Sequence, residues 1–207
     1  MVRVDLHVHT SASNDSRVAP GALAAECSRL GLSPIFITDH NTIDGASELR
    51  NAGLRVVVGE EILTTDGEVV GLFLSQAIRA GLSARDTVAA VKQQGGLVYV
   101  EHPYDMNRRR LSEKAIEEVA ESIDIVETFN GRADPRANRR AEDLRATIGA
   151  APGAGSDAHT LKELGSVYIE METFDGPQDF LAKLRLGKIV VGRSRLRLMA
   201  EKRLRRR

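Results

Sequence analysis

Strand-like and helix-like segments alternate along this chain, and no other feature constrains its fold as strongly. The expected strands are residues 2–8, 34–38, 55–59, 69–74, 97–100, 123–127, 151–155, 167–170 and 189–192. The expected helices lie between them, at residues 20–30, 43–52, 84–94, 112–121, 135–148 and 177–186. Parallel strands joined by helical crossovers give this order, either closed as a barrel or open as a doubly wound sheet. The strand at 69–74 follows its predecessor after a short turn, which predicts a hairpin.

The first expected strand favours the barrel. Its even positions from 2 to 8 are apolar, and its odd positions from 3 to 9 are polar. Since successive side chains point to opposite faces of a strand, one face is apolar and the other is polar. Both faces of an open, helix-covered sheet are normally apolar. We therefore expect an α/β barrel, with the apolar face packed on helices and the polar face turned into a lumen.

Length and composition predict a single domain. The chain has 207 residues, enough to bury a substantial core. It has no apolar run long enough to span a bilayer and no signal-peptide segment, so we expect a cytoplasmic protein without membrane contact. The one cysteine, Cys27, lies at helical spacing from Leu23 and Leu30 and is predicted to be a core residue. A metal site would therefore use nitrogen and oxygen ligands. The sequence leaves the oligomeric state open.

We divide the chain into a domain of residues 1–192 and a basic tail of residues 193–207. The tail holds eight Lys or Arg residues and one glutamate, a net charge of +7, so the first 192 residues carry −7 in a chain of net charge 0. Such a tail can contact an oligonucleotide or an anionic surface. No aromatic residue accompanies the charge, which favours a solvated terminus instead.

All five histidines lie where strand-like runs end, and acidic residues are placed in the same way. The candidate metal ligands are His7, His9, Asp15, His40, Glu61, His102, Glu127, Asp157 and His159. Imidazoles and carboxylates bind borderline-hard divalent metals, and in a barrel of parallel strands the C-terminal strand ends open at one face. The set is too large for one tetrahedral ion and suits two or three ions with a bridging carboxylate.

Local spacing supports this cluster. His7 and His9 are two residues apart on a strand, so both rings emerge on the same face. Asp157 and His159 repeat this spacing at another strand end, and Asp15 lies in a Ser-rich loop that can fold back over the site. A single histidine on a strand is usually a satisfied polar residue, but the joint pattern favours a metal site.

Four further acidic residues are expected to play other parts. Asp5 and Asp39 are predicted to orient imidazoles rather than to bind metal directly. Glu60 and Glu101 each neighbour a better candidate, and strand alternation should turn them away from the site.

Six motifs in order resemble those of the polymerase and histidinol phosphatase (PHP) domain family. They are Asp-Leu-His-Val-His-Thr (5–10), Thr-Asp-His-Asn (38–41), Gly-Glu-Glu-Ile (59–62), Glu-His-Pro-Tyr-Asp (101–105), Glu-Thr-Phe-Asn-Gly-Arg (127–132) and Gly-Ser-Asp-Ala-His (155–159). The resemblance implies a distorted seven-stranded β/α barrel with a trinuclear metal site and phosphoesterase activity. The strand–helix order extends it to about residue 192.

The resemblance also implies a division of the ligands among three ions. His7, His9, Glu61 and Asp157 would hold the first; Glu61, His102 and Glu127 the second; and Asp15, His40 and His159 the third. Asp15, Glu127 and Glu68 stand where relatives often carry histidine, and the role of Glu68 stays open. More carboxylates make the site harder, which favours manganese or iron over zinc.

This set predicts a metal-dependent phosphoric ester hydrolase. A metal-activated hydroxide would attack phosphorus. Arg108, Arg109 and Arg132 follow ligand-bearing strand ends and are candidates for binding the substrate phosphate, Arg132 foremost because it is closest in sequence to a ligand. Surface arginines without a ligand are an equally good interpretation of the run that contains Arg108 and Arg109. The residues expected to carry catalysis are His7, His9, His40, Glu61, His102, Asp157 and His159.

Three functions are compatible with these residues. The first is a phosphomonoesterase acting on a small phosphorylated metabolite or nucleotide. The second is a 5′–3′ exonuclease or phosphodiesterase that binds oligonucleotides, to which the basic tail would contribute. The third is a non-catalytic metal-binding or polymerase-associated domain, against which the complete ligand set argues.

Overall fold

The computed structural model describes residues 1–192; the predicted basic tail lies outside the described residues. The strands are β1 (Val2–Val4), β2 (Ile35–Ile37), β3 (Val56–Thr64), β4 (Gly67–Leu72), β5 (Leu97–Val100), β6 (Ile125–Asn130), β7 (Ala151–Gly155), β8 (Val167–Met171) and β9 (Lys188–Val191). The α-helices are α1 (Pro20–Leu30), α2 (Asp44–Asn51), α3 (Ala84–Gln93), α4 (Glu113–Val119), α5 (Pro135–Ile148) and α6 (Gly176–Leu184). One 3-10 turn, η1 (Ala120–Ser122), follows α4.

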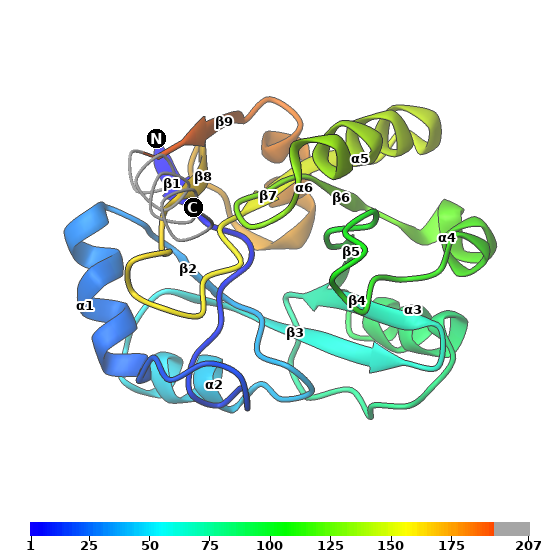
Figure 1. Cartoon of the computed structure of the whole chain (residues 1–207). Helices are drawn as coiled ribbons and strands as arrows, with labels where there is room; N and C mark the ends of the chain where they lie inside the picture. The colour runs from blue at the N-terminus through cyan, green and yellow to red at the C-terminus, as the bar shows by residue number, and fades with distance from the viewer. Residues whose placement is uncertain (193–207) are drawn as a thin grey trace, which may run out of the picture.

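Strands β2 to β7 form one curled sheet in chain order, and β1, β8 and β9 form a smaller antiparallel sheet in the order β1-β8-β9 (Figure 1). The pairs β2–β3, β5–β6 and β6–β7 are parallel. The pairs β3–β4 and β4–β5 are antiparallel, which confirms the expected hairpin. The curled sheet and its crossover helices confirm the expected α/β fold class.

Residues 6–9 bridge the two edges of the curled sheet. The amide of Leu6 donates to the carbonyl of Ala154 at the end of β7, and the amide of Asp157 donates to the carbonyl of His7 at 2.9 Å. On the other side, the amide of Thr38 donates to the carbonyl of Val8, also at 2.9 Å. The ladder of β1 itself ends at Val4, four residues earlier than expected. The segment therefore closes the half-barrel and carries its histidines into the interior.

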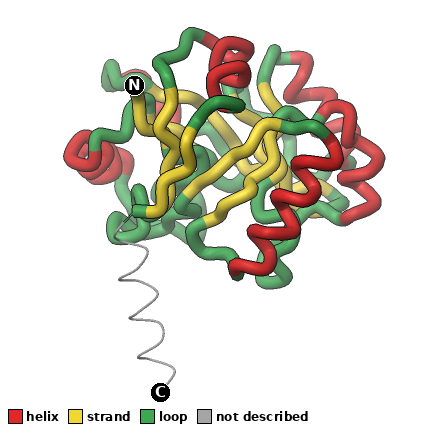
Figure 2. The backbone as a smooth tube through the Cα atoms, turned by 90° about the horizontal axis from the view of Figure 1, so that it is seen from above, coloured by secondary structure: helices red, strands yellow, loops and turns green. Residues whose placement is uncertain are grey.

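Two apolar layers cover the curled sheet. Figure 2 shows helices around the yellow strands, and the outer layer holds residues of α1 to α5, including Cys27, a core residue as predicted. The inner layer is closed by the small sheet and α6, whose Phe180 packs there. The even positions of the first strand divide between the layers: Val8 packs outside, but Val4 and Leu6 pack inside. The apolar side chains of this segment therefore contact both layers, and the inner layer includes Phe180 and Leu184 of α6.

Local sequence signals fix several helix ends. The side chain of Ser83 accepts a hydrogen bond from the amide of Asp86 at the start of α3, and Ser112 and Asp134 cap α4 and α5 in the same way. Gly31 ends α1 in the left-handed conformation that glycine adopts without strain.

Within residues 1–192, no helix has the length and apolar character required to cross a membrane.

Candidate metal centre

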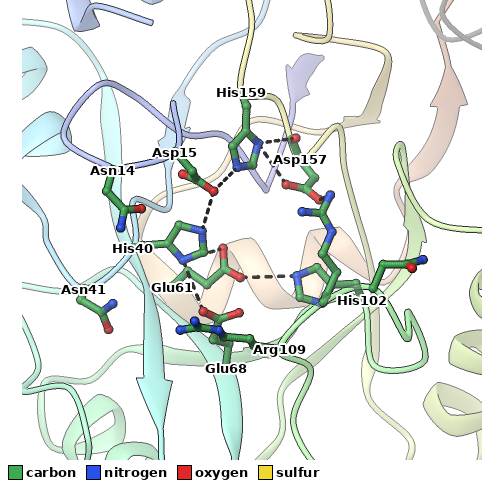
Figure 3. Close-up of a pocket in the computed structure, with 12 residues that line it drawn as sticks. Asn14, Asp15, His40, Asn41, Glu61, Glu68, His102, Arg109, Asp157 and His159 are labelled. Carbon is green, nitrogen blue, oxygen red and sulfur yellow. Dashed lines mark hydrogen bonds and ion pairs between the residues drawn. The ribbon is translucent and has the colours of Figure 1, made fainter. Parts of the chain in front are cut away.

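A polar pocket of about 290 Å³ opens where the strands of the curled sheet end. It is lined by Asn14, Asp15, His40, Asn41, Glu61, Glu68, His102, Asn107, Arg108, Arg109, Asp157 and His159. Figure 3 shows Asp15 between His159 and His40, and Glu61 between His40 and His102. His7 and His9 are fully buried close to this lining. All five histidines thus converge, as the sequence predicts.

Glu61, on β3, is the carboxylate shared by most of the histidines. Its Oε2 lies 3.0 Å from Nε2 of His7 and 3.3 Å from Nε2 of His9. Its Oε1 lies 3.4 Å from Nε2 of His102. Burial alone would raise the pKa of Glu61, but these imidazoles hold it well below its ordinary value. These contacts favour the ionised form of Glu61, whose carboxylate lines the pocket.

Asp15 gathers a second set of imidazoles at the pocket mouth. Its Oδ2 lies 2.8 Å from Nε2 of His159 and 3.4 Å from Nε2 of His40. The ring of His9 stacks beside both, with centroids 4.3 Å from His159 and 4.8 Å from His40. Burial opposes ionisation of Asp15, but the two imidazoles lower its pKa. The loop after the first strand folds back over the site, as expected from its position.

Four groups of side chains have ligand atoms within 4.8 Å of one another. They are His9–Asp15–His40–His159, His7–His9–Glu61, His40–Glu61–Glu68 and Glu61–Glu101–His102. Glu61 belongs to three of them, which suits a bridging ligand between neighbouring ions. Several buried polar atoms of these groups have no hydrogen-bond partner among the described residues, namely His9 Nε2, His102 Nδ1 and Glu101 Oε1. Bound cations would supply those partners, so the residues fit a centre of several ions.

Asp157 lies at the edge of these groups, beside the first ion's expected ligands. Its Oδ1 is 3.7 Å from Nε2 of His9 and 3.9 Å from Nε2 of His7. Burial would raise its pKa, but His7, Arg108, His9 and Arg132 lower it to about 2. Asp157 has a φ of 54° and His102 a φ of 30°, which are strained for non-glycine residues. Such strain is typical of positions where the fold forces a side chain into a site.

Glu127 lies behind His7 rather than among the four groups. Its Oε1 accepts a hydrogen bond from the hydroxyl of Tyr99 at 2.8 Å and faces Nδ1 of His7 at 3.2 Å. Its Oε2 accepts from the amide of His102 and from Nδ2 of Asn130, both at 2.9 Å. Both oxygens are thus occupied by protein donors. This carboxylate orients His7, with the Nε2 of that ring turned toward Glu61.

The three candidate arginines occupy two different places. Arg108 and Arg109 line the pocket, and Arg108 forms an ion pair of 2.9 Å with Asp157. Arg132, the foremost candidate by sequence, is not among the lining residues. Its guanidinium lies 2.6 Å from Nδ1 of His159 and donates to the carbonyl of Asp157 at 3.3 Å. Arg132 thus contacts two of the residues that line the pocket, and its role in binding the substrate stays a prediction.

Asp39 and Asp5, expected to orient imidazoles, differ in their contacts. Asp39 accepts hydrogen bonds from Thr10 and from the hydroxyl of Ser13, and that hydroxyl lies 3.3 Å from Nδ1 of His9. It therefore acts on His9 through Ser13. Asp5 accepts from backbone amides, including those of Ser156 at 2.8 Å and Gly165 at 3.1 Å. It fixes the chain that carries the ligands rather than a ring.

Two acidic residues that the sequence left aside or open belong to the groups. Glu68, on β4, lies 3.6 Å from Nδ1 of His40. Glu101 joins Glu61 and His102, although alternation predicted that it would face away. The prediction fails because β5 ends at Val100 and the next two residues leave the strand conformation. The end of the apolar run at Val100 is the sequence signal that could have found it. Glu60 does face away, accepting from the amide of Ile78 at 2.7 Å.

Two family models match the chain. The PHP domain model matches residues 5–144, and a PHP-associated model matches residues 135–189. An uncharacterized protein of Methanocaldococcus jannaschii is 34% identical over 197 residues, which cover 89% of this chain and 80% of the relative. A second uncharacterized protein of that organism is 36% identical over 143 residues, covering 62% of this chain and 82% of the relative.

Solved structures share the fold at low identity. PsfC from Pseudomonas syringae has a TM-score of 0.72 at 18% identity and covers 100% of this chain and 98% of its own. A candidate metal-dependent phosphoesterase from Bifidobacterium adolescentis has a TM-score of 0.62 at 20% identity, covering 75% and 87%. A lesion-specific endonuclease from Pyrococcus furiosus has a TM-score of 0.67 at 14% identity, covering 91% of this chain and 57% of its own.

Proposed function

Because the chain belongs to the PHP domain family, whose members are metal-dependent phosphoric ester hydrolases, we propose that it is a metal-dependent phosphomonoesterase acting on a small metabolite or nucleotide. The centre would hold two or three divalent or trivalent ions of manganese, iron or zinc. The observation that carries the proposal is the sharing of Glu61 among four imidazoles from three separate segments of the chain. An arrangement of this kind serves to hold cations close together.

The donor set indicates what bound metal would contribute. When bound, the ions lower the pKa of a coordinated water and neutralise charge on the phosphoryl group. His7, His9, Glu61 and Asp157 are proposed to hold one ion, and Asp15, His40 and His159 another. Glu61 and His102 are proposed to contribute to a further ion. Nitrogen and carboxylate oxygen donors suit manganese, iron and zinc alike, and the abundance of carboxylates favours the first two.

The protein's own residues would bind and position the ester. Arg108 and Arg109 line the pocket and can donate hydrogen bonds to phosphate oxygens. Arg132 would act from behind, keeping His159 and Asp157 in place. The pocket volume of about 290 Å³ suits a phosphoryl group with a small ester moiety.

A second candidate function is hydrolysis of phosphodiesters in oligonucleotides, including 5′–3′ exonuclease activity. A structural neighbour, Endonuclease Q, was solved with a 27-mer duplex carrying an abasic lesion at its active site, and its TM-score to this chain is 0.67 at 14% identity, covering 92% of this chain and 58% of its own. The net positive charge of the tail, which lies outside the described residues, is compatible with such a substrate.

One experiment separates these functions. Purified protein loaded with Mn²⁺ is offered nucleoside monophosphates, sugar phosphates, an aryl phosphodiester, and short single-stranded RNA and DNA. We expect release of inorganic phosphate from monoesters, its loss on chelation, and its loss in Glu61→Gln. Glu170→Gln, a change in a surface ion pair with Arg3, is the control that should keep activity. Cleavage of the polymers alone would favour the second function, and undiminished turnover of metal-free protein would refute both.

A further inference from the structure

Glu101 is a buried acid of the ligand groups that the sequence predicted to face away from the site and to which the family resemblance assigned no part. Glu101 directly precedes His102 in the sequence, where β5 has ended. Its side chain is fully buried, and that of Glu61 is only 2% exposed. A carboxyl group enclosed in this way either gains donors or cations around its oxygens or stays protonated.

We propose that Glu101 is a direct ligand of the ion held by Glu61 and His102, the place that the family resemblance gives to Glu127. This inference rests on the proposed function, since it requires a metal centre. It adds a ligand to that centre and changes the part played by Glu127.

The two oxygens of Glu101 differ in their surroundings. Oε2 accepts a hydrogen bond from the amide of Val70, on β4, at 3.0 Å. Oε1 is buried and has no hydrogen-bond partner among the described residues. The ligand atoms of Glu101, Glu61 and His102 lie within 4.8 Å of one another, a spacing that one ion can bridge. The Val70 amide would thus hold the carboxylate in place, leaving the other oxygen for the metal.

His102 shows the same incomplete pairing. Its Nε2 lies 3.4 Å from Oε1 of Glu61, and its Nδ1 is buried without a partner within residues 1–192. Two consecutive residues of one ligand group therefore each contain a buried atom that is unpaired in this part of the chain. The φ of 30° at His102 breaks the alternation of the strand, and for this reason neighbours in sequence belong to one ligand group.

Glu127 is poorly suited to the same role. Tyr99, His102 and Asn130 donate three hydrogen bonds to its carboxylate, and Nδ1 of His7 is its fourth neighbour. Binding an ion would require Glu127 to exchange some of these contacts for the metal. Glu101 would lose none, because its unpaired oxygen is already free.

Glu60 provides a matched control within the same fold. It is also fully buried, its Oε2 accepts a hydrogen bond from the amide of Ile78, and its Oε1 is unpaired among the described residues. It belongs to none of the four ligand groups. If an unpaired oxygen on a buried acid were merely a protonated structural group, Glu60 and Glu101 should respond alike to substitution.

The test compares Glu101→Gln, Glu60→Gln and Glu127→Gln in the full chain. Each protein is stripped with a chelator and equilibrated with Mn²⁺, and bound metal per chain is measured by elemental analysis and calorimetric titration. Thermal unfolding is recorded with and without Mn²⁺. We expect Glu101→Gln to bind about one Mn²⁺ fewer per chain and to lose part of the stabilisation that Mn²⁺ confers. Glu60→Gln should bind the full number.

Glu127→Gln tests whether Glu127 or Glu101 is the third ligand of the ion held by Glu61 and His102. We expect it to retain every ion but to bind Mn²⁺ about 10- to 100-fold more weakly, as is usual when a residue that orients a ligand is altered. Full metal content and unchanged affinity in Glu101→Gln would overturn the inference, and so would equal losses in Glu60→Gln. Should Glu101→Gln not fold, Glu101→Ala takes its place in the same titration. A native chain that binds no Mn²⁺ would refute the proposed function as well, which the Glu101 result alone cannot do.

Discussion

Gly155 and His7 lie so close together that a side chain on Gly155 would collide with the Cβ of His7. Gly155 ends β7, and His7 lies on the segment that closes the half-barrel. Only glycine allows the two backbones to approach in this way. The position of His7 in the metal centre therefore depends on the absence of a side chain at a residue that binds nothing itself.

We expect Gly155→Ala to displace His7 and weaken the metal centre. Overpacking of this kind typically costs about 1–3 kcal/mol of unfolding free energy. Denaturant unfolding and Mn²⁺ titration measure the two effects. Gly21→Ala is the control, since a Cβ on that helical glycine would meet nothing within 4 Å; it should leave metal binding unchanged. Equal Mn²⁺ affinity in both variants would contradict the dependence on this close approach.

Removing the Tyr99 hydroxyl should weaken metal binding indirectly, through Glu127 and His7. Tyr99→Phe leaves Oε1 of Glu127 with His7 but without its hydroxyl donor. Hydrogen bonds to charged groups contribute about 1.5–3 kcal/mol, so we expect lower stability together with a weaker hold on His7. Mn²⁺ titration with thermal unfolding checks both. Tyr168→Phe, whose ring faces Arg3 at the surface, serves as the comparison and should change neither quantity.

We expect neighbouring arginines after β5 to differ in their effect on substrate binding. Arg109 lines the pocket, whereas Arg110 does not and contacts the sulfur of Met106 at 3.4 Å. Loss of a charge-assisted hydrogen bond to the substrate predicts that Arg109→Ala raises KM for the phosphate ester by about tenfold. Arg110→Ala should leave KM unchanged. Steady-state kinetics on the same monoester decides, and equal KM values for the two variants would mean that Arg109 does not bind the substrate.

Glu60 should make the stability of the metal-free protein depend on pH. Burial raises its pKa to about 7, an effect that the amide of Ile78 only partly offsets. Between the ordinary value of 4.5 and about 7, the folded protein therefore binds more protons at this site than the unfolded chain does. The contribution of Glu60 to stability must fall as the pH rises through that window.

Glu60→Gln removes this titration. We expect the difference in unfolding free energy between the variant and the native sequence to change in favour of the variant from pH 5 to pH 7. Denaturant unfolding in the presence of a chelator at several pH values measures it, and other titrating groups cancel in the difference. A constant difference across this range would show that Glu60 titrates normally.

Strand–helix alternation was sufficient to predict the fold class and nearly all elements. It was also sufficient to predict that the histidines converge, because every one of them follows a strand and strand ends meet at one face. The alternation of side chains along a strand gave a wrong direction for Glu101, where the backbone leaves the strand conformation. Glu101 and His102 are the example, since their relative directions depend on one φ angle that sequence spacing does not encode.

The contacts of Glu127 and Arg132 could not be predicted from the sequence for a different reason. Both lie beside ligands along the chain, but their contacts come from residues far away in sequence. The hydroxyl that binds Glu127 comes from Tyr99 on the neighbouring strand β5, and the ring that Arg132 contacts belongs to His159, on the loop after β7. Whether a buried acid binds a metal or orients a histidine depends on such neighbours, and a single sequence does not identify them.

The bridge formed by residues 6–9 also bears on the order of events during synthesis. This segment is synthesised before its partners Ala154 and Ala158, which follow about 150 residues later. At translation rates of about 5–20 residues per second, His7 and His9 wait for many seconds without their final neighbours. The backbone contacts that close the half-barrel can therefore form only after residue 158 has been synthesised.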